Sequence, residues 1–196
     1  DNANETTAGG FAGYQFIGAE AGDNAGVSVS SAGDIDGDGI ADLLIGAYGA
    51  DGGGLQSGEA YLLYGADLAL ADAADGSADG VIDLDNANET TAGGFAGYQF
   101  IGTELDDRTG RSVSSAGDVD GDGQADLLIG AYLADGDGSN SGEAYLLYGA
   151  DLAAADLADG SADGVIDLDN ANETTAGGFA GYQFIGTELD DRTGRS

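Results

Sequence analysis

Residues 33–42 read Gly-Asp-Ile-Asp-Gly-Asp-Gly-Ile-Ala-Asp, and residues 117–126 repeat the pattern as Gly-Asp-Val-Asp-Gly-Asp-Gly-Gln-Ala-Asp. Counted from the first aspartate, each loop has carboxylates at positions 1, 3, 5 and 9 and a glycine at position 6. Alternating hard oxygen ligands, with a glycine for the sharp turn, are what Ca²⁺ requires, and position 7 would offer only its backbone carbonyl. The expected calcium ligands are Asp34, Asp36, Asp38, the Ile40 carbonyl and Asp42, and in the second copy Asp118, Asp120, Asp122, the Gln124 carbonyl and Asp126.

The segment after each loop distinguishes this pattern from a helix–loop–helix calcium site. That motif needs a bidentate glutamate at position 12 and a helix on each side of the loop. Position 12 is Ile45 here, inside the apolar run 43–48, which is short and contains Gly46. Such a run favours a buried strand, so each acidic loop is expected to lead directly into a strand.

The composition of the chain excludes several classes of function. Its 196 residues carry 37 acidic side chains and only 4 basic ones, for a net charge of −33. This charge repels phosphates, so nucleic acid is not expected as a partner. No apolar run approaches the length of a membrane span, so no membrane insertion is expected. Since 42% of the residues are nevertheless apolar and cluster in runs, a folded core is expected if cations offset the repulsion.

The residue types that most often carry catalysis are also missing. The chain has no His and no Cys, and its four basic residues are all Arg, which removes the usual nucleophiles and general bases. A carboxylate-based glycosidase is the remaining enzymatic alternative. Because the patterned carboxylates are already explained by metal binding, we expect a protein that is not an enzyme.

A long internal repeat organises the whole chain. The segment that begins at Asp1 returns at Asp85 and at Asp169, and residues 169–196 repeat residues 85–112 without a change. The predicted units are repeat 1 at residues 1–84, repeat 2 at 85–168 and a partial repeat 3 at 169–196. The partial repeat is expected to continue in a longer array or to be completed by a neighbouring chain.

Each period contains five segments with the character of strands and one with the character of a helix. In the first period the expected strands lie at residues 13–18, 27–32, 42–48, 59–65 and 81–84. The segment 67–74 is rich in Ala and Leu and predicts one or two helical turns, with Asp67 as the capping residue.

A second loop in each period follows the same order of ligand types. Oxygen-bearing side chains again occupy positions 1, 3, 5 and 9, with glycine at position 6. Because serine is a weaker ligand than aspartate, a polar turn without metal is the alternative. The predicted ligands are Asp75, Ser77, Asp79, the Val81 carbonyl and Asp83, and in the copy Asp159, Ser161, Asp163, the Val165 carbonyl and Asp167.

Two further features of the repeat have possible surface roles. The sequons at Asn4, Asn88 and Asn172 are candidate glycosylation sites, and they count as one observation because the repeat copies them. Arg108 and Arg111 have no basic counterpart in the first period. Local pairing with the neighbouring acidic residues is the simpler interpretation, and a contact across the repeat boundary is the alternative.

The combined pattern resembles the FG-GAP repeats of integrin α-subunit propellers and of bacterial surface proteins. The resembling residues are 26–47 with 58–65, and 110–149 in the second copy. The sequence departs from the family at the Phe of "FG" and at the Pro of "GAP", and its period is longer than a typical blade. The resemblance implies an all-β fold of four-stranded antiparallel blades, with Ca²⁺ held between the first two strands of each.

Two and a third blades are too few for a closed propeller, which takes roughly four to eight. We therefore expect an open array or filament, because near-identical units suit equivalent neighbours. The predicted function is a calcium-stabilised structural repeat protein, extracellular or on the cell surface, whose partners are copies of itself in head-to-tail contact. The alternative is a propeller-type adhesin that binds a surface protein or a glycan through loops such as 49–57 and 133–142.

Overall fold

The computed structural model describes residues 13–18, 20–74, 76–84, 97–102, 104–135, 139–158, 162–168, 181–188, 190 and 192–195. It is mostly β, with two short helices, as the sequence predicted. The strands are β1 (Gln15–Ile17), β2 (Ser28–Gly33), β3 (Asp42–Ala47), β4 (Glu59–Leu63), β5 (Val81–Asp83), β6 (Gly97–Ile101), β7 (Thr109–Gly117), β8 (Asp126–Ala131), β9 (Glu143–Leu147), β10 (Val165–Asp167) and β11 (Gly181–Ile185).

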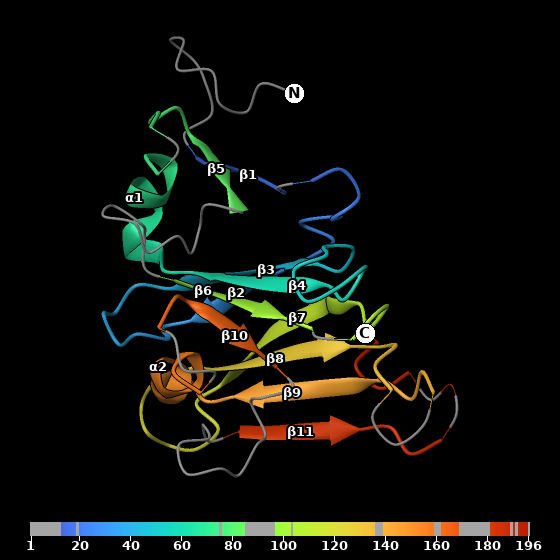
Figure 1. Cartoon of the computed structure of the whole chain (residues 1–196). Helices are drawn as coiled ribbons and strands as arrows, with labels where there is room; N and C mark the ends of the chain where they lie inside the picture. The colour runs from blue at the N-terminus through green and yellow to red at the C-terminus, as the bar shows by residue number, and fades with distance from the viewer. Residues whose placement is uncertain are drawn as a thin grey trace.

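Two four-stranded antiparallel units form the body of the molecule. We call β2-β3-β4-β6 blade 1 and β7-β8-β9-β11 blade 2, in the order in which their strands are hydrogen-bonded. In Figure 1 the β1–β5 pair, blade 1 and blade 2 follow one another from top to bottom. Within the described residues, none of the sheets closes on itself, and the expected class of blade-like repeats is confirmed.

The blades are offset from the 84-residue sequence period. The fourth strand of blade 1 is β6, which comes from the beginning of the second period, and the fourth strand of blade 2 is β11 from the beginning of the third. Ala60 pairs with Phe100 across the β4–β6 ladder, and Ala144 pairs with Phe184 across the β9–β11 ladder. A complete blade therefore needs one full period and the start of the next.

A short parallel strand joins neighbouring units. Strand β10 lies between the third and fourth strands of blade 2 in the chain but pairs with β6 of blade 1, in the register Ile166 to Phe100. Strand β5 lies between the third and fourth strands of blade 1 in the chain and pairs with β1 in the matching register, Ile82 to Phe16. The sequence predicted these strands but not their partners, because the pairing residues lie far apart in the chain.

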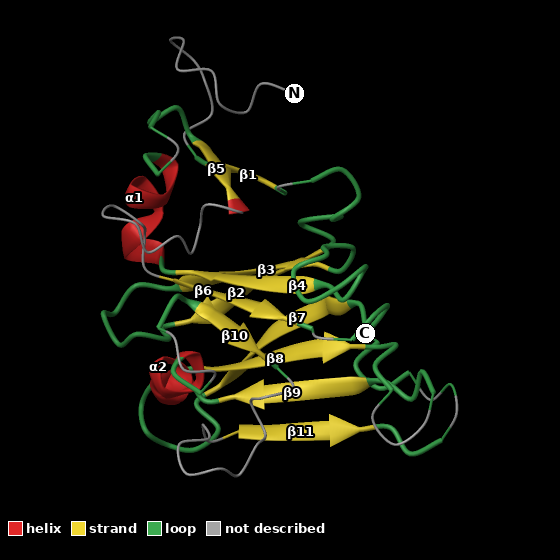
Figure 2. Cartoon of the chain, viewed as in Figure 1, coloured by secondary structure: helices red, strands yellow, loops and turns green. Residues whose placement is uncertain are grey.

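The predicted helical segment forms in both periods, next to these parallel strands (Figure 2). A 3-10 turn (η1, Gly65–Asp67) leads into α1 (Leu68–Asp72), and the copies are η3 (Gly149–Asp151) and α2 (Leu152–Asp156). The expected capping by Asp67 is wrong, because its side chain makes no capping hydrogen bond. The 3-10 turn η1 ends at Asp67, so the backbone at this position already belongs to an ordered turn when the helix begins.

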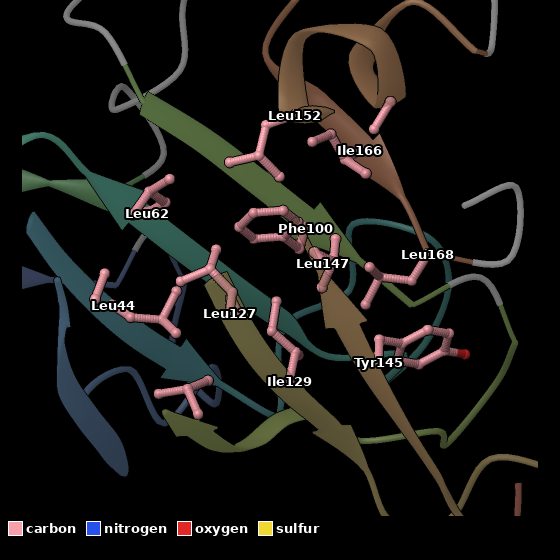
Figure 3. Packing of buried hydrophobic residues seen from close by; sticks show 14 of the residues in the cluster. Leu44, Leu62, Phe100, Leu127, Ile129, Tyr145, Leu147, Leu152, Ile166 and Leu168 are labelled. Atoms are coloured by element: carbon pink, nitrogen blue, oxygen red, sulfur yellow. The ribbon is translucent and has the colours of Figure 1, made fainter. Parts of the chain in front are cut away.

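The main core lies between the two blades. Leu44, Leu62 and Phe100 of blade 1 face Leu127 and the other apolar side chains of blade 2 (Figure 3). Helix α2 and strand β10 complete this core through Leu152, Ala155, Ile166 and Leu168. Burying each large apolar side chain contributes about 1.5–3 kcal/mol, so the blades stabilise each other. A second core on the opposite face of blade 1 contains Ile45, Tyr61, Leu63, Ile82 and Leu84.

Candidate metal centre

The two acidic loops connect the first two strands of each blade. The first acidic loop (residues 34–42) joins β2 to β3, and the second acidic loop (residues 118–126) joins β7 to β8. The strand ladder shifts register just before each loop, between Ser31 and Gly33 and between Ser115 and Gly117. Such a bulge bends the chain at the end of a ladder, and here it directs the chain into the acidic loop.

Within the first loop, the carboxylates organise the backbone. Asp34 accepts hydrogen bonds from the backbone N–H groups of Gly37 at 2.9 Å and Gly39 at 3.0 Å. Both glycines have positive φ, at 79° and 87°, a conformation that a residue with a side chain adopts only at a cost. The glycines of the pattern are therefore required by the tight turn that wraps the chain around the Asp34 side chain.

Three carboxylates converge in each loop. One oxygen each from Asp34, Asp36 and Asp42 lies within 4.8 Å of the others, and Asp118, Asp120 and Asp126 form the same group in the second loop. Calcium binds oxygen at about 2.3–2.6 Å, so two ligands on opposite sides of an ion are at most roughly 5 Å apart. The all-oxygen donor set and its spacing therefore fit Ca²⁺.

The last predicted ligand of each acidic loop is deeply buried. Asp42 and Asp126 are each 1% exposed. Asp42 accepts hydrogen bonds from the N–H of Ile35 at 2.8 Å and of Gly65 at 2.9 Å. Burial raises the pKa of Asp42, and repulsion from Asp36 and Asp38 adds to the rise, while these two hydrogen bonds oppose it. A cation in the loop would favour the ionised carboxylate and reverse this cost.

The remaining predicted ligands lie close by without joining the three-carboxylate groups. The carboxylate of Asp38 accepts a hydrogen bond from the N–H of Ile40 at 2.6 Å, and that of Asp122 accepts one from Gln124 at 2.8 Å. The Ile40 side chain is exposed, which agrees with a position whose side chain is not a ligand. The carbonyl roles of Ile40 and Gln124 stay predictions.

The Ser-containing loops are only partly within the described residues. Asp75, Asp159 and Ser161 lie outside them. Asp79 accepts a hydrogen bond from Val81 N–H, and Asp163 accepts one from Val165 N–H, each at 3.1 Å. The sequence did not single out Asp72, whose carboxylate accepts a hydrogen bond from Gly80 N–H at 2.6 Å. Asp72 is buried, and an acidic residue at the end of a predicted apolar helix was the available signal.

For the ligand roles of Ser77, Asp83 and Asp167, the structure provides no test. Among the described residues, the carboxylates that converge as a possible metal group are those of the two acidic loops. Metal binding at the Ser-containing loops therefore stays a prediction.

The two acidic loops also contact each other. The N–H of Ala125 in the second loop donates a hydrogen bond to the carbonyl of Asp34 in the first, at 3.0 Å. Ile35, beside Asp34, is 1% exposed and belongs to the core between the blades. The sequence did not predict this contact, since it depends on how one blade stacks on the next.

Each acidic loop is linked to the helical segment that follows the third strand of its blade. Gly65 N–H donates to Asp42, and Gly149 N–H donates to Asp126 at 3.1 Å. A Cβ at Gly65 would collide with the carbonyl of Ala41, so a glycine is required for this close approach. Gly149 begins the 3-10 turn that leads into α2, and Leu152 of this helix is buried between the blades. The second acidic loop therefore supports the packing of the two blades through this helix.

The arginines show both contacts that the sequence left open. Arg108 pairs with Asp106 at 3.1 Å, which is the local interpretation. The guanidinium groups of Arg108 and Arg111 also lie 5.7 and 5.6 Å from the ring centroid of Tyr48, which belongs to the first period. These cation–π contacts cross the repeat boundary. The sequons at Asn4, Asn88 and Asn172 lie outside the described residues.

Comparison with known proteins agrees with this architecture. The family model described as FG-GAP repeat matches residues 25–63 and 109–147, the first three strands and the acidic loop of each blade. A search of curated proteins found no match. None of the described helices is long and apolar enough to cross a membrane. The resemblance seen in the sequence is therefore confirmed, and residues 25–63 and 109–147 are two repeats of the FG-GAP family.

Proposed function

We propose that this chain is a calcium-stabilised, extracellular structural protein whose blades stack in a long array. The observation that carries the proposal is the hydrogen bond from Ala125 to Asp34, which joins the two acidic loops across the junction between blades. An ion that orders either loop would also order this junction. A structural role of this kind requires no catalytic residue.

The charge of the chain explains why a cation is needed. At a net charge of −33, the carboxylates repel one another, and each acidic loop concentrates several of them. Ca²⁺ would bind the folded loops and not the unfolded chain, so its binding free energy would add to the free energy of unfolding. Extracellular calcium is close to millimolar, which is enough even for weak sites with dissociation constants of about 10⁻⁴–10⁻³ M.

Thermal unfolding with and without calcium tests the proposal. At calcium concentrations of about 100 times the dissociation constant, each filled loop adds about 2.7 kcal/mol. For two loops this corresponds to a rise in Tm on the order of 10–20 °C in a chain of this size. Magnesium at equal concentration is the matched control, because it demands a stricter octahedral geometry and gives up its water reluctantly.

Electron microscopy of the same samples tests the array. Filaments or long stacks are expected with calcium and their loss is expected with a chelator. A melting temperature and a morphology that do not respond to chelation would contradict the proposal. Discrete particles that bind a surface protein or a glycan would instead support the adhesin.

A further inference from the structure

The two acidic loops pack against each other inside the molecule. Both lie on the side that carries α1 and α2 (Figure 1). The side chain of Gln124 in the second loop comes within 4.0 Å of the position that a Cβ on Gly37 would take in the first. The Cβ of Ala125 lies 2.6 Å from the position of a Cβ on Gly33, so the contact leaves no room for an added methyl group there.

One peptide group of the second loop serves both loops. The N–H of Ala125 donates to the carbonyl of Asp34 at 3.0 Å. The peptide bonds of the described residues are all trans, and in a trans peptide the N–H and the C=O point in opposite directions. The carbonyl of Gln124 belongs to the same peptide group as the N–H of Ala125. It therefore points away from the first loop, as a ligand to an ion in the second loop must.

The peptide group that accepts this hydrogen bond continues to a predicted ligand of the first loop. The carbonyl of Asp34 and the N–H of Ile35 belong to one peptide group, and this N–H donates to the carboxylate of Asp42 at 2.8 Å. Two peptide groups in series thus lead from the position-7 carbonyl of the second loop to the buried carboxylate of the first. The side chain of Ile35 fixes the middle of this path, because it is buried in the core between the blades.

We propose that the two acidic loops bind calcium cooperatively, each raising the affinity of the other through the peptide groups 124–125 and 34–35. Order in one loop fixes the hydrogen bond between Ala125 and Asp34, so the other loop loses less conformational entropy when it binds. Hydrogen bonds in series also polarise and strengthen one another. The coupling must be reciprocal, with the same factor in both directions. This inference rests on the proposed function, because it concerns the calcium sites on which that function depends.

Electrostatic repulsion opposes this coupling and can be separated from it. An ion in one loop reduces the negative charge that attracts a second ion to the other loop. Salt screens this repulsion between the sites, whereas it has much less effect on a hydrogen bond between backbone groups in contact. Calcium binding is therefore measured in about 1 M NaCl, where the Debye length is about 3 Å. Cooperativity that remains under these conditions is assigned to the backbone path.

A thermodynamic cycle measures the coupling by isothermal titration calorimetry. Asp36→Ala removes a ligand from the first loop and Asp120→Ala removes its equivalent from the second. Both side chains are exposed and bond to the backbone of their own loop. The double variant provides the baseline for binding elsewhere in the chain. Relative to this baseline, the overall association constant of the unmodified chain should exceed the product of those of the two single variants by at least about fivefold. Equality would overturn the proposal.

A matched pair of glycine variants tests the contact between the loops. Gly33 and Gly117 precede the two loops at equivalent positions, with φ of 88° and 73°, so alanine strains the backbone similarly at both. A Cβ on Gly33 would collide with Ala125, whereas one on Gly117 would meet none of the described residues within 4 Å. Gly33→Ala should therefore separate the loops and abolish the cooperativity, and Gly117→Ala should retain it. Cooperativity that is equal in the two folded variants would overturn the proposal.

The amide of Ala125 gives a readout at a single atom, by nuclear magnetic resonance of Asp120→Ala. In this variant, calcium that fills the first loop should shift the Ala125 resonance and slow its hydrogen exchange at least about fivefold, because its acceptor becomes fixed. The neighbouring amide of Gln124 is the control, since it donates to Asp122 within the second loop, and it should change less. An Ala125 amide that does not respond to calcium would contradict the coupling even if Gly33→Ala failed to fold.

The outcomes separate this inference from the function on which it rests. Calcium binding by both loops with an unresponsive Ala125 amide and no cooperativity in the cycle would overturn the coupling, while the calcium-stabilised structural protein stands. Titrations in which neither Asp36→Ala nor Asp120→Ala changes calcium binding would overturn both.

Discussion

At the scale of single residues, the buried aspartate that closes each loop has the most demanding position. Asp42 lies at the start of β3, almost completely shielded from water, yet it must be ionised to bind a metal. Its hydrogen bonds from Ile35 and Gly65 hold the side chain in place at the end of the loop. Its contribution to stability should therefore depend strongly on calcium.

Replacement of this residue tests that dependence. Asp42→Asn keeps the size of the side chain but removes the charge and one of the two hydrogen-bond acceptors. Calcium binding should weaken about tenfold or more, equivalent to at least about 1.4 kcal/mol. Isothermal titration calorimetry measures the affinity, and urea unfolding with calcium or chelator measures stability.

The loss of stability in Asp42→Asn should be larger in calcium than in chelator. Asp67→Asn is the control, because Asp67 makes no capping hydrogen bond and lies outside both acidic loops. Equal losses in the two conditions would assign Asp42 a role in folding alone.

The raised pKa values predict how stability responds to pH without calcium. Burial raises the pKa of Asp42 above 3.8 and that of Glu59 above 4.5, although Tyr61 and Gln99 donate hydrogen bonds to Glu59. A carboxyl with a raised pKa binds more protons in the folded than in the unfolded state. Its contribution to the free energy of unfolding is complete below the pKa of the unfolded state. That contribution is lost as the pH rises through the pKa of the folded state.

In chelator, the free energy of unfolding should therefore fall as the pH rises from below 3.8 through the folded pKa values. In saturating calcium the trend should reverse, because the ion competes with protons for the carboxylates. Urea unfolding across this range with each additive measures both trends. The same slope in both conditions would show that calcium does not bind these groups.

At the scale of elements, the short helix after the third strand of each blade contributes through packing rather than through its own stability. A five-residue helix such as α2 is too short to be stable alone in water. It persists because Leu152 and Ala155 are buried between the blades and because Gly149, just before it, is bonded to the second acidic loop. The helix therefore connects the second acidic loop to the core.

Truncation of the buried leucine tests this role. Leu152→Ala should destabilise the protein by about 2–5 kcal/mol, as expected for a cavity in a packed core. Leu157→Ala, at the exposed end of the same helix, should change stability by less than about 0.5 kcal/mol. Urea unfolding in calcium measures both, and equal effects would contradict the packing of α2 between the blades.

At the scale of the whole molecule, the charge sets the conditions under which the blades stay together. A net charge of −33 on 196 residues destabilises the compact state through self-repulsion. The two blades pack on one another through the core between them, so repulsion acts against both at once. Bound calcium and dissolved salt should each reduce it.

Salt dependence tests this electrostatic account. In chelator, Tm should rise as NaCl increases from about 0.01 M to 1 M, since the Debye length falls from about 30 Å to 3 Å. In saturating calcium the rise should be smaller, because part of the charge is already neutralised. Differential scanning calorimetry measures both, and an equal rise in both conditions would contradict neutralisation by bound ions.

Local sequence determined most of the elements. The period, the acidic loops with their glycines, the five strands and the short helix in each period were all predictable, because each depends on residues close together in the chain. The positive φ of Gly39 and the exposed side chain of Ile40 follow from the ligand spacing within the loop itself.

Only the tertiary structure decided how these elements combine. The fourth strand of each blade comes from the next period, β10 crosses to the preceding blade, and Ala125 reaches the loop of its neighbour. The two copies of Gly-Tyr-Gln-Phe-Ile-Gly at residues 97–102 and 181–186 are identical in sequence, yet Phe100 is buried and Phe184 is exposed. The physical reason is that burial and strand pairing depend on which blade lies alongside, and a repeated sequence contains no information that distinguishes one copy's neighbours from another's.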